Sequence, residues 1–387
     1  MTENSITTTE NNKGWFSRFL ATVEWLGNLL PHPVTLFAIL TVFIVLLSGF
    51  LSWLGVSVAD PRPEDAQTAS GTIEVVSLMS VEGLHWIMTH IVTNFTGFAP
   101  LGTVLVALLG VSVAEHSGLL STAMRALVLN APRRLVTFIV VLSGILSNTA
   151  SELGYVVLIP LAAMIFHSLG RHPLAGLAAA FAGVSAGYSA NLFLGTIDPL
   201  LAGITTPAAQ MIDPNYVVGA ESNHFFMIAS TFVIAALGFF VTDRIVEPRL
   251  GKFDESKSTM VLDEKAMASP SAQEMKAMKM AGLAFLGLCV LVALAVVPEA
   301  GVLRNPETGG LKGSPFLKGI VVLIFVMFAI PGFVYGKVAG TMKNDRDVIE
   351  GMARSMSSMG LYIALVFFAA QFVAFFKYTN LGTVLAV

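Results

Sequence analysis

The sequence predicts an all-α polytopic membrane protein, and three observations support this class. Charged residues make up 12% of the 387 residues, about half the share typical of soluble domains, whereas hydrophobic residues make up 55%. The mean hydropathy is +0.76. The apolar residues also form runs of 17 or more residues without Asp, Glu, Lys or Arg. Such long, continuous runs are typical of transmembrane helices and not of the alternating strands of an outer-membrane barrel.

The same composition excludes several classes of protein. The formal net charge of −3 provides no basic surface for a nucleic acid partner, and the apolar runs exclude a soluble enzyme and a disordered chain. The single cysteine, Cys289, lies inside an apolar run, so neither a disulfide framework nor a thiolate metal site is available. We therefore expect the lipid bilayer as a partner, no nucleic acid and no cofactor.

The N-terminal segment lacks the basic start of a cleavable signal peptide. Residues 15–30 place apolar side chains on one helical face, so residues 1–30 are predicted to form a polar tail and an interfacial amphipathic helix. The predicted spans are 34–54, 223–242, 280–297, 319–336, an element at 84–114 that is interrupted at Pro100, and a last element that begins near residue 359.

The loop charges predict the orientation of the chain. Residues 55–83 hold five acidic residues and one arginine, whereas residues 115–134 hold three arginines and one glutamate. The positive-inside rule makes the first loop external and the second cytoplasmic, which leaves the N-terminus in the cytoplasm. The charged segment 243–279 is predicted to be a cytoplasmic linker, and a linking span at 280–298 follows it.

Residues 135–169 do not fit a single span. An apolar arm of 12 residues precedes the polar stretch SNTASELG, and a second apolar arm follows it. Twelve helical residues reach roughly 18 Å, which is too short for a hydrocarbon core of about 30 Å, and both flanks are basic. We therefore predict a re-entrant hairpin with Ser147, Asn148 and Thr149 at its tip. The irregular backbone there must be buried in protein or face a water-filled cavity.

A second interruption follows in residues 174–204. The stretch SANLFLGTIDPLLAGI places Gly195 and Pro199 where they loosen a helix. Secondary transporters build ion and substrate sites from such broken helices. Because the two interruptions are adjacent in the sequence, we expect them to face each other and to form one oxygen-lined site. The predicted substrate- and ion-binding residues are Ser147, Asn148, Thr149, Glu152, Asn191, Gly195, Thr196 and Asp198.

Several of these residues also have a structural interpretation. Asp198 is the only acidic residue between Glu152 and Asp213, so it is either a site carboxylate or the cap of a helix. Asn148 and Thr149 could hold the turn by side-chain to backbone hydrogen bonds, a role that can coexist with binding. Glu152 could relay protons or pair with a neighbouring side chain.

A short internal repeat predicts the symmetry of the fold. The pentapeptide LGTVL occurs at 101–105 and at 381–385, an offset of 280 residues, and this offset carries span 34–54 close to span 319–336. These two spans are predicted to cross the membrane in opposite directions, as in inverted-repeat transporters. The predicted repeats are 31–242 and, incomplete, 313–387. The offset would place a second hairpin beyond Val387, so we expect the sequence to be part of a longer protein.

Several segments of the sequence resemble one family of transporters. They are PHPVTLF (31–37), FTGFAPLGTVLV (95–106), ILSNTASELGYVVLIPL (145–161), SLGRHPLAGLAAAFAGVSAGYSANLFLGTIDPLLAGI (168–204) and FFAAQFVAFF (367–376). From about residue 15 onward the chain resembles the aminobenzoyl-glutamate transporter family (AbgT-type). The resemblance implies a homodimer in the bacterial inner membrane, with nine spans and two re-entrant hairpins. The family's hairpin-tip asparagine and broken-helix aspartate match Asn148 and Asp198.

The resemblance also implies the function. Members of the family are associated with uptake of p-aminobenzoyl-glutamate, and others with export of p-aminobenzoate and sulfonamide antimetabolites. We therefore expect a secondary transporter driven by H⁺ or Na⁺ and not an enzyme, with Asn148 and Asp198 as ligands if the ion is Na⁺. Two alternatives stay open: an intramembrane hydrolase of aminobenzoyl compounds and a channel.

Overall fold

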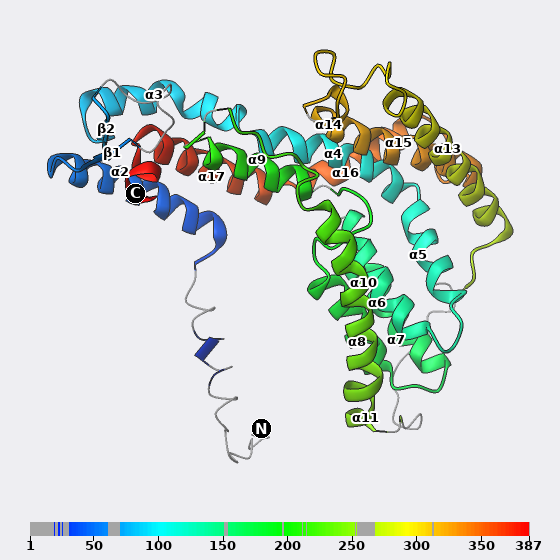
Figure 1. Ribbon diagram of the computed structural model, residues 1–387. Helices are drawn as coiled ribbons and strands as arrows, with labels where there is room; N and C mark the ends of the chain where they lie inside the picture. The colour runs from blue at the N-terminus through cyan, green and yellow to red at the C-terminus, as the bar shows by residue number, and fades with distance from the viewer. Residues whose placement is uncertain are drawn as a thin grey trace. The chain divides into compact units, whose positions relative to one another are not determined.

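The computed structural model describes residues 19, 22–23, 25, 31–60, 70–150, 154–195, 197–210, 212–213, 215–251, 253, 268–311 and 313–386. Most of these residues are helical (Figure 1), which confirms the predicted all-α class. The predicted interfacial helix at 15–30 lies almost wholly outside the described residues, and so does the middle of the predicted linker 243–279.

Six helices in the described part of the chain are long and apolar enough to cross a membrane. They are α2 (Pro33–Trp53), α3 (Val81–Thr96) together with α4 (Ala99–His116), α10 (His224–Val241) with its extension to Leu250, α13 (Ala272–Val296), α15 (Ile320–Ala339) and α17 (Gly360–Tyr378). The interruption that the sequence predicts at Pro100 falls just before α4. Pro100 itself lies in the first turn, where its missing N–H costs no helical hydrogen bond.

Three segments are more helical than the sequence predicts. Helix α13 begins at Ala272 and not near 280, because Ser271 and Glu274 form a capping box in which each side chain accepts the other residue's backbone N–H. The predicted loop 115–134 contains helix α5 (Leu119–Leu129). After α10, a π-helical turn η4 (Thr242–Val246) and α11 (Glu247–Leu250) continue the helix into the predicted linker.

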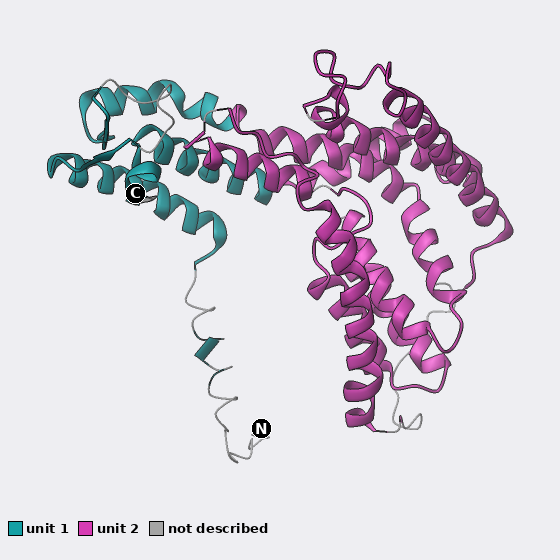
Figure 2. Ribbon diagram, in the orientation of Figure 1, with its two compact units in different colours: residues 1–95, 361–387 teal, residues 96–360 magenta. Residues whose placement is uncertain are grey.

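The chain forms two compact units, shown in Figure 2. Unit 1 consists of residues 1–95 and 361–387, and holds α2, α3, α17, α18 (Leu381–Ala386) and a two-stranded antiparallel sheet. Strand β1 (Ser57–Ala59) pairs with β2 (Thr72–Glu74) inside a segment that the sequence analysis treats as a loop. Ile44 and Ile73 pack in one buried cluster with Phe375, so this unit cuts across the predicted repeats.

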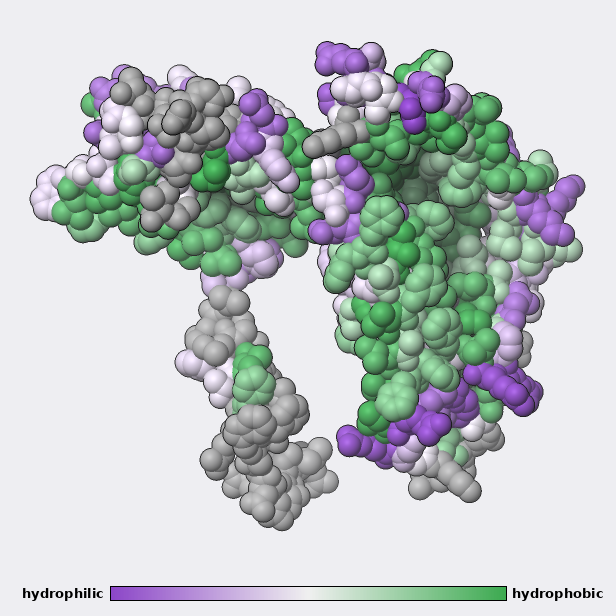
Figure 3. Space-filling model, viewed as in Figure 1, coloured by the Kyte–Doolittle hydropathy of each residue, from purple (hydrophilic) through white to green (hydrophobic). Residues whose placement is uncertain are grey.

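Unit 2 consists of residues 96–360 and contains the remaining described helices. Figure 3 shows apolar residues over most of the visible face of this unit and hydrophilic residues at its upper and lower ends and along its right edge; the broad apolar face suits a lipid environment. The elements not yet named are α6 (Val136–Ser147), η2 (Asn148–Ala150), η3 (Gly154–Leu158), α7 (Ile159–Ser168), α8 (Pro173–Ala186), α9 (Ile197–Ala209), α14 (Pro315–Lys318) and α16 (Asp345–Ser357).

Helix α8 is the element on which both hairpin arms pack, since α6 and α7 each contact it closely. Glycines make this approach possible: a Cβ atom at Gly183 of α8 would lie 2.5 Å from the Val141 carbonyl oxygen of α6. A Cβ atom at Gly176 would lie 2.5 Å from the Ala162 carbonyl oxygen of α7. The small residues of α8 thus serve close backbone packing, as in other membrane helices.

Gly183→Ala should destabilise unit 2, because the added methyl group meets a backbone carbonyl that cannot move aside. We expect a loss of roughly 1–3 kcal/mol, typical of overpacking, visible as a lower apparent Tm in detergent. The matched control is Gly102→Ala in α4, where a Cβ atom has nothing within 4 Å. That variant should keep or slightly raise the Tm, and equal losses in both variants would contradict the packing argument.

Candidate functional site

Regular α-helical hydrogen bonding stops at the tip of the predicted hairpin. Helix α6 ends at Ser147, the 3-10 turn η2 follows, and the π-helical turn η3 leads into α7. Pro160 in the first turn of α7 has no N–H to donate, which favours a change of hydrogen-bonding pattern there. Single π-helical turns are frequent at functional sites. The interruption therefore lies at the predicted residues, and its depth in the membrane stays a prediction.

The Asn148 side chain joins this tip to the end of α8. Its amide nitrogen lies 3.1 Å from the Ile145 carbonyl oxygen, 3.2 Å from that of Val184 and 3.3 Å from that of Gly187. The last carbonyls of a helix lack intrahelical partners, so the amide supplies what the end of α8 is missing. The side chain is 7% exposed. Asn148 is thus a buried cross-link, and its amide has two hydrogens to share among three acceptors.

The second interruption separates α8 from α9 and is also closed by side chains. Asn191, which is buried, accepts the backbone N–H of Leu192 at 2.9 Å and donates to the Thr149 hydroxyl. The Asp198 carboxylate accepts the Gly195 N–H at 2.7 Å, which is the contact of a residue at the start of a helix. Both the structural and the site interpretations of Asp198 therefore fit this position.

The backbone of the interruption is strained at Ser189. Its φ of +69° lies in the left-handed region, which non-glycine residues rarely adopt. Such strain costs of order 1–3 kcal/mol and is concentrated at ligand-binding and switch regions. Its presence between α8 and α9 indicates that the surrounding contacts, and not local preference, hold this segment.

The structure brings most of the predicted site residues together. Thr149 bonds to Asn191, and a Cβ atom on Gly195 would lie 4.0 Å from the Thr149 Cα and 3.8 Å from the Asp198 carboxylate. Ser147 is different, because its hydroxyl donates to the Gly144 carbonyl at 2.6 Å within α6. Glu152 and Thr196 lie outside the described residues. In the described part of the chain, no three His, Cys, Asp or Glu residues cluster as metal ligands.

An apolar cavity of about 690 Å³ borders the hairpin tip. Ser147 and Thr149 line one side of it, and residues 192–194 of the interruption line another. The remaining walls come from α5, α13, His224 at the start of α10, and the region of α14 and α15, where Phe285 and Phe328 are among the lining residues. This volume lies in the range of small-molecule sites. The cavity could not be predicted from the sequence, because its walls come from segments far apart in the chain.

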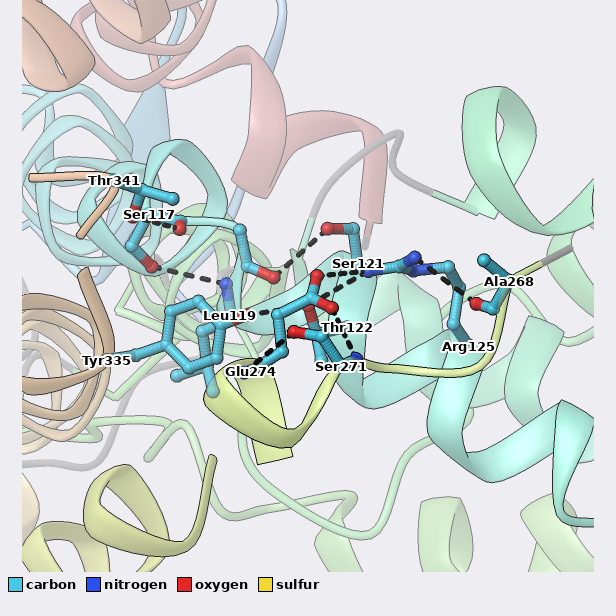
Figure 4. Close-up of polar contacts among 11 residues, drawn as sticks. Ser117, Leu119, Ser121, Thr122, Arg125, Ala268, Ser271, Glu274, Tyr335 and Thr341 are labelled. Carbon is cyan, nitrogen blue, oxygen red and sulfur yellow. Dashed lines mark hydrogen bonds and ion pairs between the residues drawn. The ribbon is translucent and has the colours of Figure 1, made fainter. Parts of the chain in front are cut away.

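A polar network joins three of the helices that line the cavity (Figure 4). The Arg125 guanidinium of α5 lies 2.6 Å from the Glu274 carboxylate of α13 and 3.4 Å from the Thr122 hydroxyl. The Thr122 hydroxyl is 2.7 Å from the Tyr335 hydroxyl of α15, and both side chains are 1% exposed. Glu274 also accepts the Ser271 N–H at the start of α13. The network therefore fixes α5, α13 and α15 to one another.

A second ionic network lies at the base of the hairpin. Arg171, between α7 and α8, pairs with Asp243 at 2.7 Å and with Glu247, and donates to the Thr137 hydroxyl at 2.8 Å. Its guanidinium also lies 4.1 Å from the centroid of the Phe166 ring. Burial lowers the pKa of Arg171, but its hydrogen bonds to Glu247 and Asp243 outweigh that effect and raise the pKa above its ordinary value. The cation thus ties both ends of the hairpin to the helix that follows α10.

Asn148→Ala should destabilise the protein by roughly 1–3 kcal/mol, because it removes the buried hydrogen bonds that join the hairpin tip to the end of α8. Thermal unfolding in detergent measures this as a lower apparent Tm. Asn130→Ala is the matched control, since the exposed Asn130 amide donates to a single carbonyl at the end of α5. A loss at Asn148 no larger than that at Asn130 would show that the cross-link is unimportant.

Glu274→Gln tests the network of Figure 4 without removing the helix cap, because glutamine also serves in a capping box. We expect a loss of about 1 kcal/mol, since the pair is largely shielded, with 18% and 30% of the two side chains exposed. Glu350→Gln removes an ion pair whose side chains are 70% and 58% exposed, and should cost less than about 0.5 kcal/mol. Unfolding in detergent compares the two variants, and equal effects would refute the bracing role.

Known proteins match almost the whole chain. The profile of the AbgT putative transporter family matches residues 18–387. The p-aminobenzoyl-glutamate transport protein of Escherichia coli (strain K12) is 38% identical over 365 residues, which is 94% of this chain and 70% of that protein.

Two solved structures share the fold. One is MtrF of Neisseria gonorrhoeae, described as illuminating a class of antimetabolite efflux pumps. It is 60% identical with a TM-score of 0.86, and the match covers 94% of this chain and 72% of MtrF. The other is the YdaH transporter of Alcanivorax borkumensis, which has an unusual topology. It is 44% identical with a TM-score of 0.82, over 92% of this chain and 72% of YdaH. Together with the family match, these similarities show that the chain belongs to the AbgT family of membrane transporters.

Proposed function

We propose that this protein is an ion-gradient-coupled secondary transporter of p-aminobenzoyl-glutamate, p-aminobenzoate and similar folate fragments, with sulfonamide antimetabolites as exported substrates of the same class. One observation carries the proposal: the hairpin tip and the interruption between α8 and α9 meet beside an apolar cavity of about 690 Å³. The names of the Escherichia coli relative and of MtrF support the choice of substrate class.

The geometry supports a reason for ion coupling. The start of α9 carries the partial positive charge of a helix N-terminus, which attracts the carboxylate of such a solute. The Asp198 carboxylate lies at the same place and repels an anion. A proton or a sodium ion that neutralises Asp198 removes this repulsion, so the ion and the solute bind better together than apart.

Both candidate ions suit the oxygen atoms at this site. A proton would bind to Asp198 itself, whereas Na⁺ would take oxygen ligands from Asn148 and Asp198, with Thr149 beside them. The solute and ion then move together when the protein alternates between its outward-open and inward-open states.

The proposed setting is the bacterial inner membrane, with a multi-pass chain, a cytoplasmic N-terminus and a homodimeric assembly. The loop charges support the orientation. The family resemblance supports the dimer.

Asp198→Asn should reduce gradient-driven accumulation of p-aminobenzoyl-glutamate at least tenfold, because the amide neither binds a proton nor provides a charge for Na⁺. The measurement is uptake of labelled solute into proteoliposomes with an imposed H⁺ or Na⁺ gradient, using protein expressed from its complete gene. Asp213→Asn is the control, since this exposed aspartate only accepts a backbone N–H in its loop. Normal accumulation by Asp198→Asn would refute the role given to Asp198.

The same assay separates the alternative functions. A transporter accumulates the intact solute at a saturable rate that requires the gradient. Cleaved aminobenzoyl products would instead support an intramembrane hydrolase. Flux that neither saturates nor responds to the gradient would support a channel.

A further inference from the structure

The Ser143 hydroxyl is a polar group beside the cavity that neither the helix packing nor the proposed ion site accounts for. Ser143 lies in α6, is 1% exposed, and lines the apolar cavity beside the hairpin tip. Its oxygen has no hydrogen-bond partner among the residues that the structure describes. Buried polar side chains without partners are uncommon in folded proteins, and each requires a specific reason.

The other buried serines of the described chain behave differently. Ser48, Ser112, Ser117 and Ser147 each donate to the carbonyl three residues earlier, at distances of 2.6 to 2.9 Å. Ser314 accepts a backbone N–H at the start of α14. Helical position therefore does not explain the unpaired hydroxyl of Ser143, since serines in equivalent helical surroundings find partners.

The location of Ser143 connects it to the cavity. Ser143 and Ser147 are one helical turn apart on the same face of α6, and Thr149 follows at the tip, so three hydroxyl-bearing residues line this edge of the cavity. The rest of the lining is apolar apart from His224 at the start of α10, and it includes Phe285 and Val292 of α13. A flat, apolar molecule with one polar substituent suits a mostly apolar cavity with hydroxyl-bearing residues along one edge.

We infer that this cavity holds the aromatic ring of the solute, and that the Ser143 hydroxyl determines specificity by accepting a hydrogen bond from an amine on that ring. Ser143 makes no hydrogen bond in either direction within the described part of the chain, so its oxygen is free to accept one from a group in the cavity. Because the hydroxyl turns about a single torsion, it can meet a group in the cavity without movement of the helix.

The protonation state of the amine favours an aromatic one. An amine attached directly to an aromatic ring is neutral at physiological pH, whereas an alkyl amine carries a positive charge that an apolar cavity disfavours. The inference deepens the proposed function, on which it rests for the solute class, and adds the residue that distinguishes ring substituents. Ser143 is thus a specificity residue, separate from the ion-coupling role proposed for Asp198.

The single cysteine of the chain provides a direct measurement, because Cys289 lines the same cavity. Purified protein expressed from its complete gene is treated with N-ethylmaleimide, and labelling is followed by the mass of the peptide that contains Cys289. The probes are p-aminobenzoate and p-methylbenzoate, in which a methyl group replaces the amine at nearly constant shape. Each probe is titrated for its protection of Cys289, and Cys289→Ser shows the background.

Both probes should protect Cys289, since both place a ring in the cavity. Ser143→Ala should lower the preference for p-aminobenzoate over p-methylbenzoate roughly 3- to 10-fold. This is the change in affinity expected when one hydrogen bond between neutral groups is lost. Ser112→Ala is the matched control, because this buried serine in α4 already donates to the Leu109 carbonyl and does not line the cavity. Its preference should equal that of the unmodified protein.

Two results would overturn the inference: no protection by either probe, or an unchanged preference in Ser143→Ala. The flux assay is read separately, so that the two proposals fail independently. Gradient-driven flux with an unprotected Cys289 would overturn the ring site and leave the transport function. Protection with the expected change of preference, but without flux, would support the ring site and contradict transport.

Discussion

A helix that ends inside a bilayer leaves backbone groups that neither lipid nor water can satisfy, so the protein must provide their partners. Asn148 donates to carbonyls at the end of α8, and Asn191 reaches back to Thr149 at the hairpin tip. Asp198 accepts a backbone N–H just before α9. Side chains therefore supply hydrogen-bond partners at each interruption. The hairpin tip supplies donors to the end of α8, and Asn191 beyond α8 donates to Thr149 at the tip. This mutual dependence holds the candidate site together.

Close packing and ionic networks hold the two interruptions in place. Glycines let α6 and α7 approach α8 until their backbones touch, which fixes the tip against the helix that it completes. Arg171 ties the base of the hairpin to the extension of α10, and Arg125 ties α5 to α13, two of the helices that line the cavity.

The sequence predicts the helical class, the spans and the position of both interruptions, because these depend on local hydropathy and on residues that break helices. It also predicts that Asn148, Thr149 and Asn191 come close together. It does not predict α5, because the arginine of this segment led to the prediction of a loop. It also does not predict the early start of α13, which depends on a capping box. The cavity and the unpaired Ser143 could not be predicted, since both depend on contacts between segments distant in the chain. The inverted repeat and the binding roles of all the predicted site residues stay predictions.

The sharing of α8 by both hairpin arms constrains how the length of this region can change in evolution. Each residue added to a helix turns the following part by about 100°. A deletion in the tip would therefore turn the face of α7 that meets Gly176 away from α8. The π-helical turn η3 is one of the few devices by which a helix takes up an extra residue without such a rotation. Length variation should thus accumulate in the connecting loops, while the segment from Asn148 to Gly176 keeps its number of residues.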